Sequence, residues 1–491
     1  MRSVARLSSA LRQRPVSFGL AAASLGLCSV LAGCSTDDGD DGDKAPAGFS
    51  TTSCLDFPAP CLNIAAGQEA KLQEESQLLG DGTTIVLGEG TFVLDNQVTI
   101  RQAKGVTLIG QGIDKTILNF GGMKVQANGV DVIGDDFRIE GLTIEDAKKD
   151  ALRVEDSDGV TIRKVKVTWT AGPKTENGAY GLYPVKCVHV LVEDCEAWNA
   201  SDAGLYVGQS RHVVVRNNLA SGNVAGIEIE NTQFADVYGN TATNNTAGLA
   251  VFDLPGNPVI GRDIHVHDNI IEANNMANFA PGGTVAEIPA GTGTFILASR
   301  RVQFDNNIYK DNVTVDIAIL NGLAIEGKAS KWRLANDKLV GDSSGLDLPS
   351  DATGVSNYRT SDILIRDNTH SGGGANIDGG KPGIKRQLGL LLSIVYGSTP
   401  VDSVVYDGWG ESSFDAKDAS KNTNDNRVCL KGNTGASVVN LHLDVVLPAA
   451  LKGTFPKLED LYRPAAPFAP YDCDAMQGGP IAAPTMPQLG Q

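Results

Sequence analysis

Histidine and basic residues are scarce in this sequence, and each shortage excludes a class of protein. Six histidines are scattered over 491 residues and no Cys-x-x-Cys motif occurs, so we expect no bound metal, no haem and no other cofactor. Lys and Arg number 41 against 58 Asp and Glu, which gives a net charge of −17. An acidic chain of this kind is a poor partner for nucleic acid and for anionic lipid surfaces, and we expect neither.

The first 33 residues have the composition of an export signal. Four arginines precede an apolar run, residues 18–31, that is too short to span a membrane comfortably. The run ends in Leu-Ala-Gly-Cys at residues 31–34, which resembles the lipobox of bacterial lipoproteins. That resemblance implies cleavage before Cys34 and acylation of its sulfur, so we expect a membrane-anchored protein of the bacterial cell envelope. Ser35, rather than Asp, after this cysteine resembles lipoproteins that are sorted to the outer membrane. The alternative is a plain secretory signal with an incidental cysteine.

Residues 34–50 contain five aspartates among glycines and are typical of an extended acidic tether, because such a run buries nothing and repels itself. The signal holds four basic and no acidic residues, so the chain from Cys34 onward carries a net charge of −21. Export permits disulfides, and proximity in the sequence favours two of them, Cys54–Cys61 and Cys429–Cys473. Cys187 and Cys195 are candidates for buried thiols, since Cys195 falls at a core position of the repeat described next.

A repeat with a basic period of about 22–23 residues runs through the middle of the chain. Short runs of alternating apolar residues recur with successive separations of 23, 30, 23, 22, 29, 38 and 61 residues. Period-2 alternation inside each run predicts strands rather than helices, and the longer separations predict insertions at fixed places. The central apolar residues of the runs are Ile139, Ile162, Val192, Val215, Val237, Val266, Phe304 and Ile365.

Asparagines recur in two registers that are in phase with these runs. In stacked coils, equivalent asparagines can hydrogen-bond the next coil and form a ladder. The first register holds Asn218, Asn240, Asn269, Asn307 and Asn368, and the second, five residues later, holds Asn223, Asn245, Asn274 and Asn312. The Leu-x-x-Leu-x-Leu pattern of a leucine-rich horseshoe is absent. The repeat resembles that of the carbohydrate-binding and sugar-hydrolase type of β-helix protein, and we expect an all-β, right-handed parallel β-helix.

The remaining segments are assigned around this solenoid. A solenoid needs covered ends, and apolar residues at helical spacing over residues 64–79 predict a capping helix. Residues 321–360 interrupt the repeat over a length that exceeds an ordinary loop, and we expect them to cover one face or edge. The expected organisation is a lipoprotein signal peptide (1–33), an acidic tether (34–50), an N-terminal cap (51–82), β-helix repeats (83–320), an irregular insertion (321–360), C-terminal coils (361–447) and a Pro-rich tail (448–491).

A second strand in each coil follows the pattern small-Gly-apolar-x-apolar-x and supplies the candidate site. Alternation turns its apolar residues inward and their neighbours outward, with about 4.8 Å between coils. The outward residues form a column that reads Arg153, Tyr183, Tyr206, Glu228 and Ala250. Tyrosine faces stack on sugar rings and glutamate can transfer a proton, so Tyr183, Tyr206 and Glu228 are the candidate catalytic residues. A surface ion pair beside a half-buried aromatic ladder would give the same pattern.

The charges around this column indicate what it could bind. Residues 148–186 hold eight basic and five acidic residues, a local excess of positive charge in an acidic chain where an anionic sugar could bind. The candidate substrate-binding residues are Arg153, Lys186, His189, His212, Glu230 and Asp253. His265 and His267 share one side of a strand, but no third ligand lies nearby in the sequence, so we expect solvated surface histidines there.

The stretch 131–275 resembles periplasmic mannuronan epimerases and the β-helix protein of the maturation system for copper-containing nitrous-oxide reductase. In the epimerases, the strand after Tyr-Gly carries an Asp-Pro-His-Asp signature. Here Tyr183, Val185 and Lys186 replace its first Asp, its His and its last Asp, and only the Pro matches. The resemblance therefore implies the fold and does not carry the epimerase activity over. The whole chain also resembles a family of exported β-helix lipoproteins, which implies another exported protein as a partner, for example a c-type cytochrome encoded nearby.

Two functions remain open at this point. The first is an envelope protein that binds carbohydrate or a partner protein without catalysis. The second is a polysaccharide lyase, hydrolase or epimerase that acts on an anionic glycan with a non-standard residue set. The missing epimerase signature favours the first, while the basic stretch and the tyrosines are consistent with carbohydrate binding in either case.

Overall fold

The computed structural model of the protein describes residues 46–379, 387–450 and 452–487. The expected export signal (1–33), Cys34 and most of the tether lie outside the described residues. In the described ranges, no helix combines the length and the hydropathy needed to cross a membrane.

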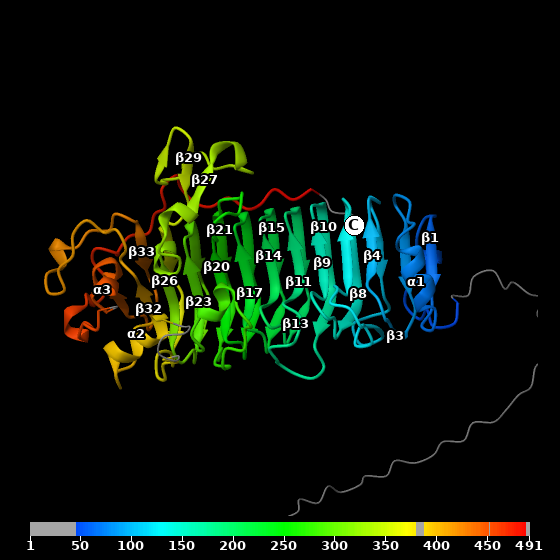
Figure 1. The fold of residues 1–491 in the computed structure, drawn as a ribbon, viewed down its shortest axis with the longest axis horizontal. Helices are drawn as coiled ribbons and strands as arrows, with labels where there is room; N and C mark the ends of the chain where they lie inside the picture. Colours follow the sequence, from blue (N-terminus) through cyan, green and yellow to red (C-terminus); the bar gives the residue numbers. More distant parts are fainter. Residues whose placement is uncertain (1–45, 380–386, 451, 488–491) are drawn as a thin grey trace, which may run out of the picture. The chain divides into compact units, whose positions relative to one another are not determined.

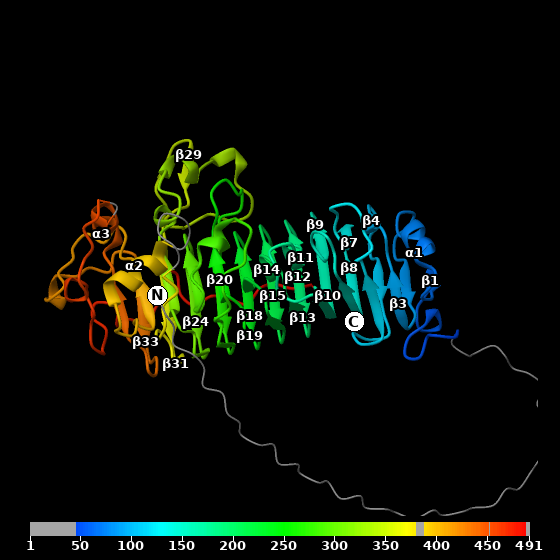
Figure 2. The ribbon, with the colours of Figure 1, turned by 60° about the horizontal axis from the view of Figure 1, so that its bottom comes forward.

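Two long parallel sheets run through the described chain and form a right-handed parallel β-helix (Figures 1 and 2). The larger one, sheet A, contains β1 (Cys61–Ile64), β2 (Thr84–Leu87), β3 (Gly90–Val93), β5 (Thr107–Ile109), β6 (Thr116–Asn119), β8 (Phe137–Glu145), β10 (Asp158–Thr168), β12 (Val188–Glu193), β13 (Glu196–Trp198), β15 (Arg211–Arg216), β16 (Leu219–Ser221), β18 (Gln233–Tyr238), β19 (Thr241–Thr243), β21 (Arg262–His267), β22 (Ile270–Glu272), β24 (Arg300–Asp305), β25 (Ile308–Lys310), β30 (Ser361–Arg366), β31 (Thr369–Ser371) and β33 (Val428–Lys431). Sheet B contains β4 (Val98–Arg101), β7 (Val130–Ile133), β9 (Leu152–Glu155), β11 (Tyr180–Val185), β14 (Ala203–Gly208), β17 (Ala225–Glu230), β20 (Ala247–Phe252), β23 (Thr292–Leu297), β26 (Val315–Leu320), β32 (Val404–Tyr406) and β34 (Val438–Asn440).

A typical coil contributes two strands to sheet A and one to sheet B, as β15, β16 and β17 do. Equivalent residues pair from coil to coil, so that Val192 lies beside Val215, and Val215 beside Val237. The central apolar residues predicted from the repeat are all fully buried. Burial of each such side chain contributes about 1.5–3 kcal/mol, which is the main force that closes the coil around its core.

Both predicted asparagine ladders are present. The side-chain Nδ2 of Asn218 donates to Oδ1 of Asn240 at 2.9 Å, and the backbone N–H of Asn218 donates to the same oxygen at 3.0 Å. The first ladder continues past Asn368 to Asn433, which the sequence register did not include. The residue before each ladder asparagine turns the corner with a positive φ, as Asn217 does at 56°. Asn, Asp and Gly tolerate that conformation best, which explains their recurrence at these corners.

The N-terminal segment differs in detail from its expected helix. A strand, β1, occupies residues 61–64, and helix α1 is shorter than predicted at Glu69–Glu75, with Leu72 buried in the core. The two expected disulfides, Cys54–Cys61 and Cys429–Cys473, are both formed. Cys187 and Cys195 are free and buried, as predicted.

An additional apolar layer covers the later strands of sheet B on their outer side. It includes helix α2 (Gln387–Tyr396), helix α3 (Leu443–Ala450) and part of the 321–360 insertion, whose Trp332 is buried against Gly322. The insertion also forms a small antiparallel sheet that Figure 1 shows beside the coils. Its strands are β27 (Arg333–Ala335), β28 (Ser350–Asp351) and β29 (Gly354–Ser356). Part of the insertion therefore packs against the outer side of sheet B, whereas Asp342 contacts Gln233 and Arg262 on sheet A.

The Pro-rich tail returns along the solenoid. The Tyr471 carbonyl accepts a hydrogen bond from the N–H of Leu430 in β33 at 2.8 Å. Further on, the Gln477 N–H donates to Asp362 at 2.9 Å, at the start of β30. Figure 1 shows this segment, in red, continuing back over earlier coils. The tail is thus held in place by the Cys429–Cys473 disulfide and by backbone hydrogen bonds.

Candidate functional site

The outward column predicted for sheet B exists. Arg153 on β9 pairs with Tyr183 on β11, and Tyr206 on β14 pairs with Glu228 on β17, which is followed by Ala250 on β20. The residues inward of this column are buried, as the strand alternation requires. The column therefore brings the three candidate catalytic residues Tyr183, Tyr206 and Glu228 onto adjacent strands.

Three tyrosines meet at this column. The ring centroids of Tyr183 and Tyr206 are 4.8 Å apart, and Tyr180 lies 4.4 Å from Tyr183 and 4.8 Å from Tyr206. Tyr180 and Tyr183 are half-buried, whereas Tyr206 is buried. Tyr180 was not among the predicted site residues, because it stands at the start of its strand, out of phase with the outward column.

Three carboxyl groups lie against these tyrosines. The Tyr206 hydroxyl donates to Glu230, which also accepts from Nδ2 of Asn257 at 2.7 Å. The Tyr180 hydroxyl donates to Asp202, a residue of the turn before β14. Among the described residues, no hydrogen-bond donor reaches Oε2 of Glu228. We call Tyr180, Tyr183, Tyr206, Asp202, Glu228 and Glu230 the tyrosine–carboxyl cluster.

Burial keeps the carboxyl groups of this cluster protonated to unusually high pH. Loss of hydration, together with the neighbouring Asp202 and Glu230 carboxyls, raises the pKa of Glu228 well above its usual range. Burial raises the pKa of Asp202 to about 7, with the Asp150 carboxyl contributing, and the pKa of Glu230 to about 7, with Asp202 and Asp253 contributing. Because the carboxyl groups interact, the cluster titrates as a unit and holds protons at neutral pH.

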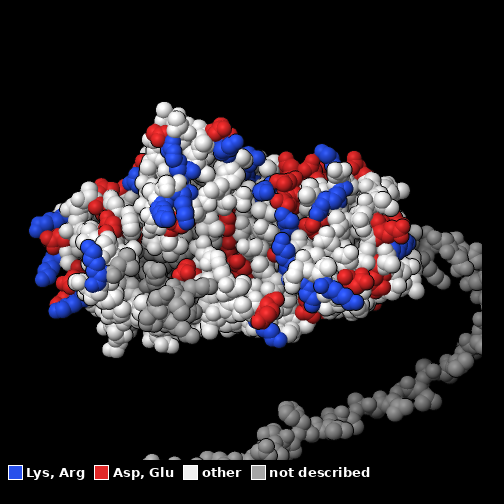
Figure 3. Space-filling model, viewed as in Figure 1, with Lys and Arg blue, Asp and Glu red and all other residues white. Residues whose placement is uncertain are grey.

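The cluster is deeper than the open groove expected from the sequence. Glu228 is only 2% exposed and Tyr206 3%, because the segments after β20 lie over the outer side of sheet B. Leu254, Phe279 and Ala280 pack in the same apolar layer as Tyr180 and Tyr183. Figure 3 shows acidic atoms in the middle of this face, over β14 and β17, surrounded by uncharged atoms. The two half-buried tyrosines therefore form the side of the cluster that a ligand could contact.

The two cations predicted to bind an anionic sugar beside the column, Arg153 and Lys186, form the predicted basic rim, and their charge is largely neutralised. Arg153 forms an ion pair with Glu155, and Nζ of Lys186 lies 2.9 Å from the other oxygen of the same carboxylate. Two cations thus share one anion, and the local positive charge available to an anionic ligand is smaller than the sequence suggested.

The other predicted binding residues lie elsewhere. Asp253 is fully buried, and its Oδ2 lies 2.6 Å from Nη1 of Arg300 in an internal ion pair. His189 and His212 stack on each other with centroids 5.3 Å apart, but they belong to β12 and β15 of sheet A rather than to the strands of the tyrosine column. Neither histidine belongs to the tyrosine–carboxyl cluster, and Asp253 acts on it only through its charge, which helps to raise the pKa of Glu230.

A separate cavity of about 390 Å³ lies beside the later coils. Its charged lining residues are paired with one another: Arg463 Nε lies 2.7 Å from Asp402 Oδ2, and His370 Nδ1 lies 3.0 Å from Asp316 Oδ2. A cavity of this size fits a small ligand, but its charges already have partners, so the tyrosine–carboxyl cluster remains the better candidate for acid–base chemistry.

Comparison with known proteins supports the class of the fold. Residues 104–263 match the family model described as a right handed beta helix region. Together with the observed coils, this match makes the chain a right-handed parallel β-helix protein with a distant resemblance to mannuronan epimerases and an alginate lyase. A search of curated protein sequences gave no match.

Solved structures match this chain at low sequence identity and with low TM-scores. The A-module of the mannuronan C-5 epimerase AlgE4 from Azotobacter vinelandii is 15% identical with a TM-score of 0.42, over 79% of this chain and 95% of that one. An alginate lyase from Paenibacillus sp. is 14% identical with a TM-score of 0.30, over 53% and 94%. The catalytic unit of an α-1,3-glucanase from Streptomyces thermodiastaticus is 12% identical with a TM-score of 0.39, over 72% and 52%. These neighbours are carbohydrate-active enzymes, and the likeness concerns the fold.

Proposed function

We propose that this protein hydrolyses a polysaccharide at the tyrosine–carboxyl cluster. The observation that carries the proposal is the group of three buried carboxyls on adjacent turns and strands: the raised pKa of Glu228 keeps it protonated, while pKa values of about 7 leave Asp202 and Glu230 partly ionised at neutral pH. A protonated carboxyl beside an ionised one is the pair that glycosidic bond hydrolysis requires. The exposed sides of Tyr180 and Tyr183 offer faces on which a sugar ring can stack.

In this mechanism Glu228 is the acid. Glu228 donates its proton to the leaving oxygen as the glycosidic C–O bond breaks, and water attacks the anomeric carbon. Asp202 or Glu230 accepts the proton that the water loses. The product is a new reducing end; Glu228 takes a proton from solvent, and the carboxyl that acted as base returns its proton to solvent.

The charges around the cluster favour a neutral glycan over the anionic one considered from the sequence. Three carboxyls lie in the cluster, and both cations of the predicted rim, Arg153 and Lys186, contact Glu155. A uronate brought to the half-buried tyrosines would meet like charge whenever the cluster ionises, whereas a neutral sugar would not.

The test is release of reducing ends from a panel of neutral glucans, xylans and chitin, with alginate and polygalacturonate alongside. Glu228→Gln should lower turnover about 10²–10⁴-fold while leaving binding in place, because it keeps the shape and removes the proton. Glu272→Gln, on β22 of sheet A and outside the cluster, is the matched control and should leave turnover unchanged. Equal turnover by the wild type and Glu228→Gln would contradict the mechanism.

A second candidate function is glycan binding without turnover. The observation that favours it is the 2% exposure of Glu228, which limits approach of a glycosidic oxygen to its carboxyl. Binding by the wild type that Tyr183→Ala abolishes, with no reducing ends released from any glycan of the panel, would select this candidate.

We further propose that the protein is exported and held on a bacterial membrane, at the outer membrane, by acylation of Cys34. The support is the Leu-Ala-Gly-Cys motif at residues 31–34 after an apolar run and four arginines. Radiolabelled palmitate should enter the wild type and not Cys34→Ala, and the variant should appear in the soluble fraction. Equal labelling of both would refute the anchor. An exported protein partner stays a prediction.

A further inference from the structure

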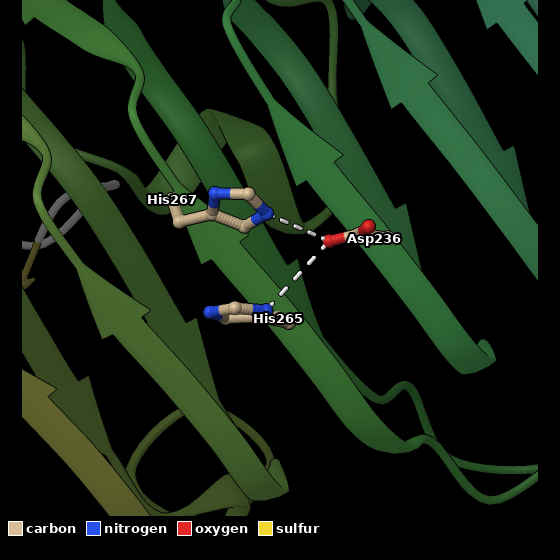
Figure 4. A group of neighbouring side chains, drawn as sticks. All are labelled: Asp236, His265 and His267. Carbon is tan, nitrogen blue, oxygen red and sulfur yellow. Dashed lines mark hydrogen bonds and ion pairs between the residues drawn. The ribbon is translucent and has the colours of Figure 1, made fainter. Parts of the chain in front are cut away.

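Asp236, His265 and His267 come together on the outer side of sheet A, on a different sheet from the tyrosine–carboxyl cluster. Asp236 is on β18, both histidines are on β21, and Asp236 and His265 are direct partners in the parallel register. Their neighbours Val237 and Val266 are fully buried, so strand alternation turns all three polar side chains outward. Figure 4 shows both imidazole rings directed toward the same oxygen of Asp236.

The three side chains have the spacing of metal ligands. Oδ1 of Asp236 lies 3.0 Å from Nε2 of His267 and 3.7 Å from Nδ1 of His265, and all three ligand atoms lie within 4.8 Å of one another. Bonds of about 2.0–2.1 Å to tetrahedral Zn²⁺ place neighbouring ligand atoms about 3.4 Å apart. Small side-chain rotations would bring these three atoms to that separation.

Each histidine is also held from behind by a second carboxylate. Nε2 of His265 lies 2.5 Å from Oδ1 of Asp305, and Nδ1 of His267 lies 2.7 Å from Oδ2 of Asp268. In metal sites, a ligating histidine commonly donates its other ring N–H to a carboxylate, which selects the tautomer and orients the ring. Both histidines of this group have that arrangement, and the other ring nitrogen of each is turned toward Asp236.

Stacking restrains the rings further. The imidazoles of His265 and His267 stack with centroids 4.2 Å apart, and the Tyr238 ring stacks on His267 at 5.0 Å. Gln303 donates to Oδ1 of Asp305 at 3.1 Å and so holds the carboxylate behind His265. The ligand atoms are therefore preorganised on two adjacent strands, β18 and β21, with Asp305 on the next strand, β24, rather than carried by loops.

We propose that Asp236, His265 and His267 bind a divalent first-row transition metal of the Zn²⁺ class. Two imidazoles and one carboxylate suit Zn²⁺ and its neighbours, whereas Ca²⁺ and Mg²⁺ prefer oxygen ligands throughout. Three protein ligands leave a fourth position on the solvent side, where water or a group of a partner molecule can bind. The three side chains are between one fifth and one quarter exposed, which leaves that position accessible.

Zn²⁺ titration of the purified chain by calorimetry, in chelator-treated buffer, tests this site. The wild type should bind one Zn²⁺ that Asp236→Asn, His265→Ala and His267→Ala each weaken at least about 10-fold. His212→Ala is the matched control: it removes a stacked histidine from the same sheet, and it should leave Zn²⁺ binding unchanged. Absence of Zn²⁺ binding in the wild type, or equal binding by His265→Ala, would overturn the proposal and leave a plain histidine–aspartate ion-pair group.

Co²⁺ provides a second readout that does not depend on affinity alone. Bound at this site, it should give visible absorption bands that Zn²⁺ displaces and that His267→Ala lacks. Asp305→Asn, which alters the positioning residue behind His265, should lower Zn²⁺ affinity about 10–100-fold while the metal-free variant melts at nearly the wild-type temperature. If Asp305→Asn and the three ligand variants bind Co²⁺ with the wild-type spectrum, the metal is held elsewhere and the assignment is wrong.

Discussion

Tyr206 and Glu228 lie side by side on β14 and β17 as direct partners in the parallel sheet, and both side chains are almost completely buried on its outer face. The Glu228 carboxyl in that position loses its hydration, and the one cation of the same column, Arg153, lies three coils away. Glu228 is therefore protonated rather than charged. In the proposed mechanism, this is the proton that Glu228 donates to the leaving oxygen.

The stability of the protein should fall as the pH rises from 5 to 8. The pKa values of Asp202 and Glu230 are raised to about 7, above their ordinary values near 4, so the folded protein holds protons that the unfolded chain has released. This stabilisation is fully present below about pH 4 and is lost as the pH passes 7, at a cost of a few kcal/mol. Thermal unfolding midpoints across this range measure it. A midpoint that is flat or rises toward pH 8 would contradict the assignment.

Glu228→Gln should reduce that pH dependence. The amide has nearly the same shape as the protonated carboxyl and cannot ionise, so the mutant loses one of the interacting groups and lowers the repulsion on the other two. The expected result is a smaller fall in melting temperature between pH 5 and pH 8 than in the wild type. Glu272→Gln on sheet A should reproduce the wild-type curve, and identical curves for all three proteins would rule out a role of Glu228 in the titration.

The asparagine ladder should be a major source of stability. Asn240 accepts two hydrogen bonds from Asn218 and donates to Asn269 and to the Val215 carbonyl. Asn240→Ala leaves these buried partners unsatisfied, at about 1–3 kcal/mol for each, so a large drop in melting temperature is expected. Asn336→Ala, at an exposed position of the insertion, should change the melting temperature by little. Similar drops in melting temperature for the two variants would show that a ladder asparagine stabilises the protein no more than an exposed one.

Removal of the second disulfide should release the tail. Cys473 joins the returning tail to β33, and the bond closes a loop with a sequence separation of 44 residues. Cys473→Ser should therefore expose the segment after residue 471 to protease while the coils stay resistant. Limited proteolysis followed by mass spectrometry locates the cuts. Protection equal to that of the wild type would mean that the hydrogen bonds at Leu430 and Asp362 suffice without the disulfide.

The fold was predictable because its determinants repeat. Alternation around residues such as Val215 and Val237 indicates strands, and the asparagine registers indicate how the coils stack. The column Tyr183–Tyr206–Glu228 followed from the same register. In a solenoid each coil contacts only its neighbours, so residues at the same position of successive repeats lie side by side. The repeat in the sequence therefore predicts which residues are neighbours in space.

The parts of the sites that escaped prediction come from outside the regular strands or from another coil. Asp202 lies in a turn, so a column read along strands omits it. Asp236 precedes His265 by 29 residues, the same separation as Val237 and Val266, and that register alone could have identified it as the third ligand. The depth of Glu228 depends on the segments that cover sheet B, and the outward Ala250 and Phe295 of the following coils are the sequence signal for that cover.

The most direct test of the account is an infrared measurement of carboxyl protonation at pH 7. A difference spectrum between the wild type and Glu228→Gln isolates the C=O stretch of a single protonated carboxylic acid. The account predicts a protonated-acid band at pH 7 in the wild type that is missing from the variant. A carboxylate band in its place, with Glu228 titrating near 4.5 as an ordinary glutamate, would contradict the claim that this cluster stores a proton for catalysis.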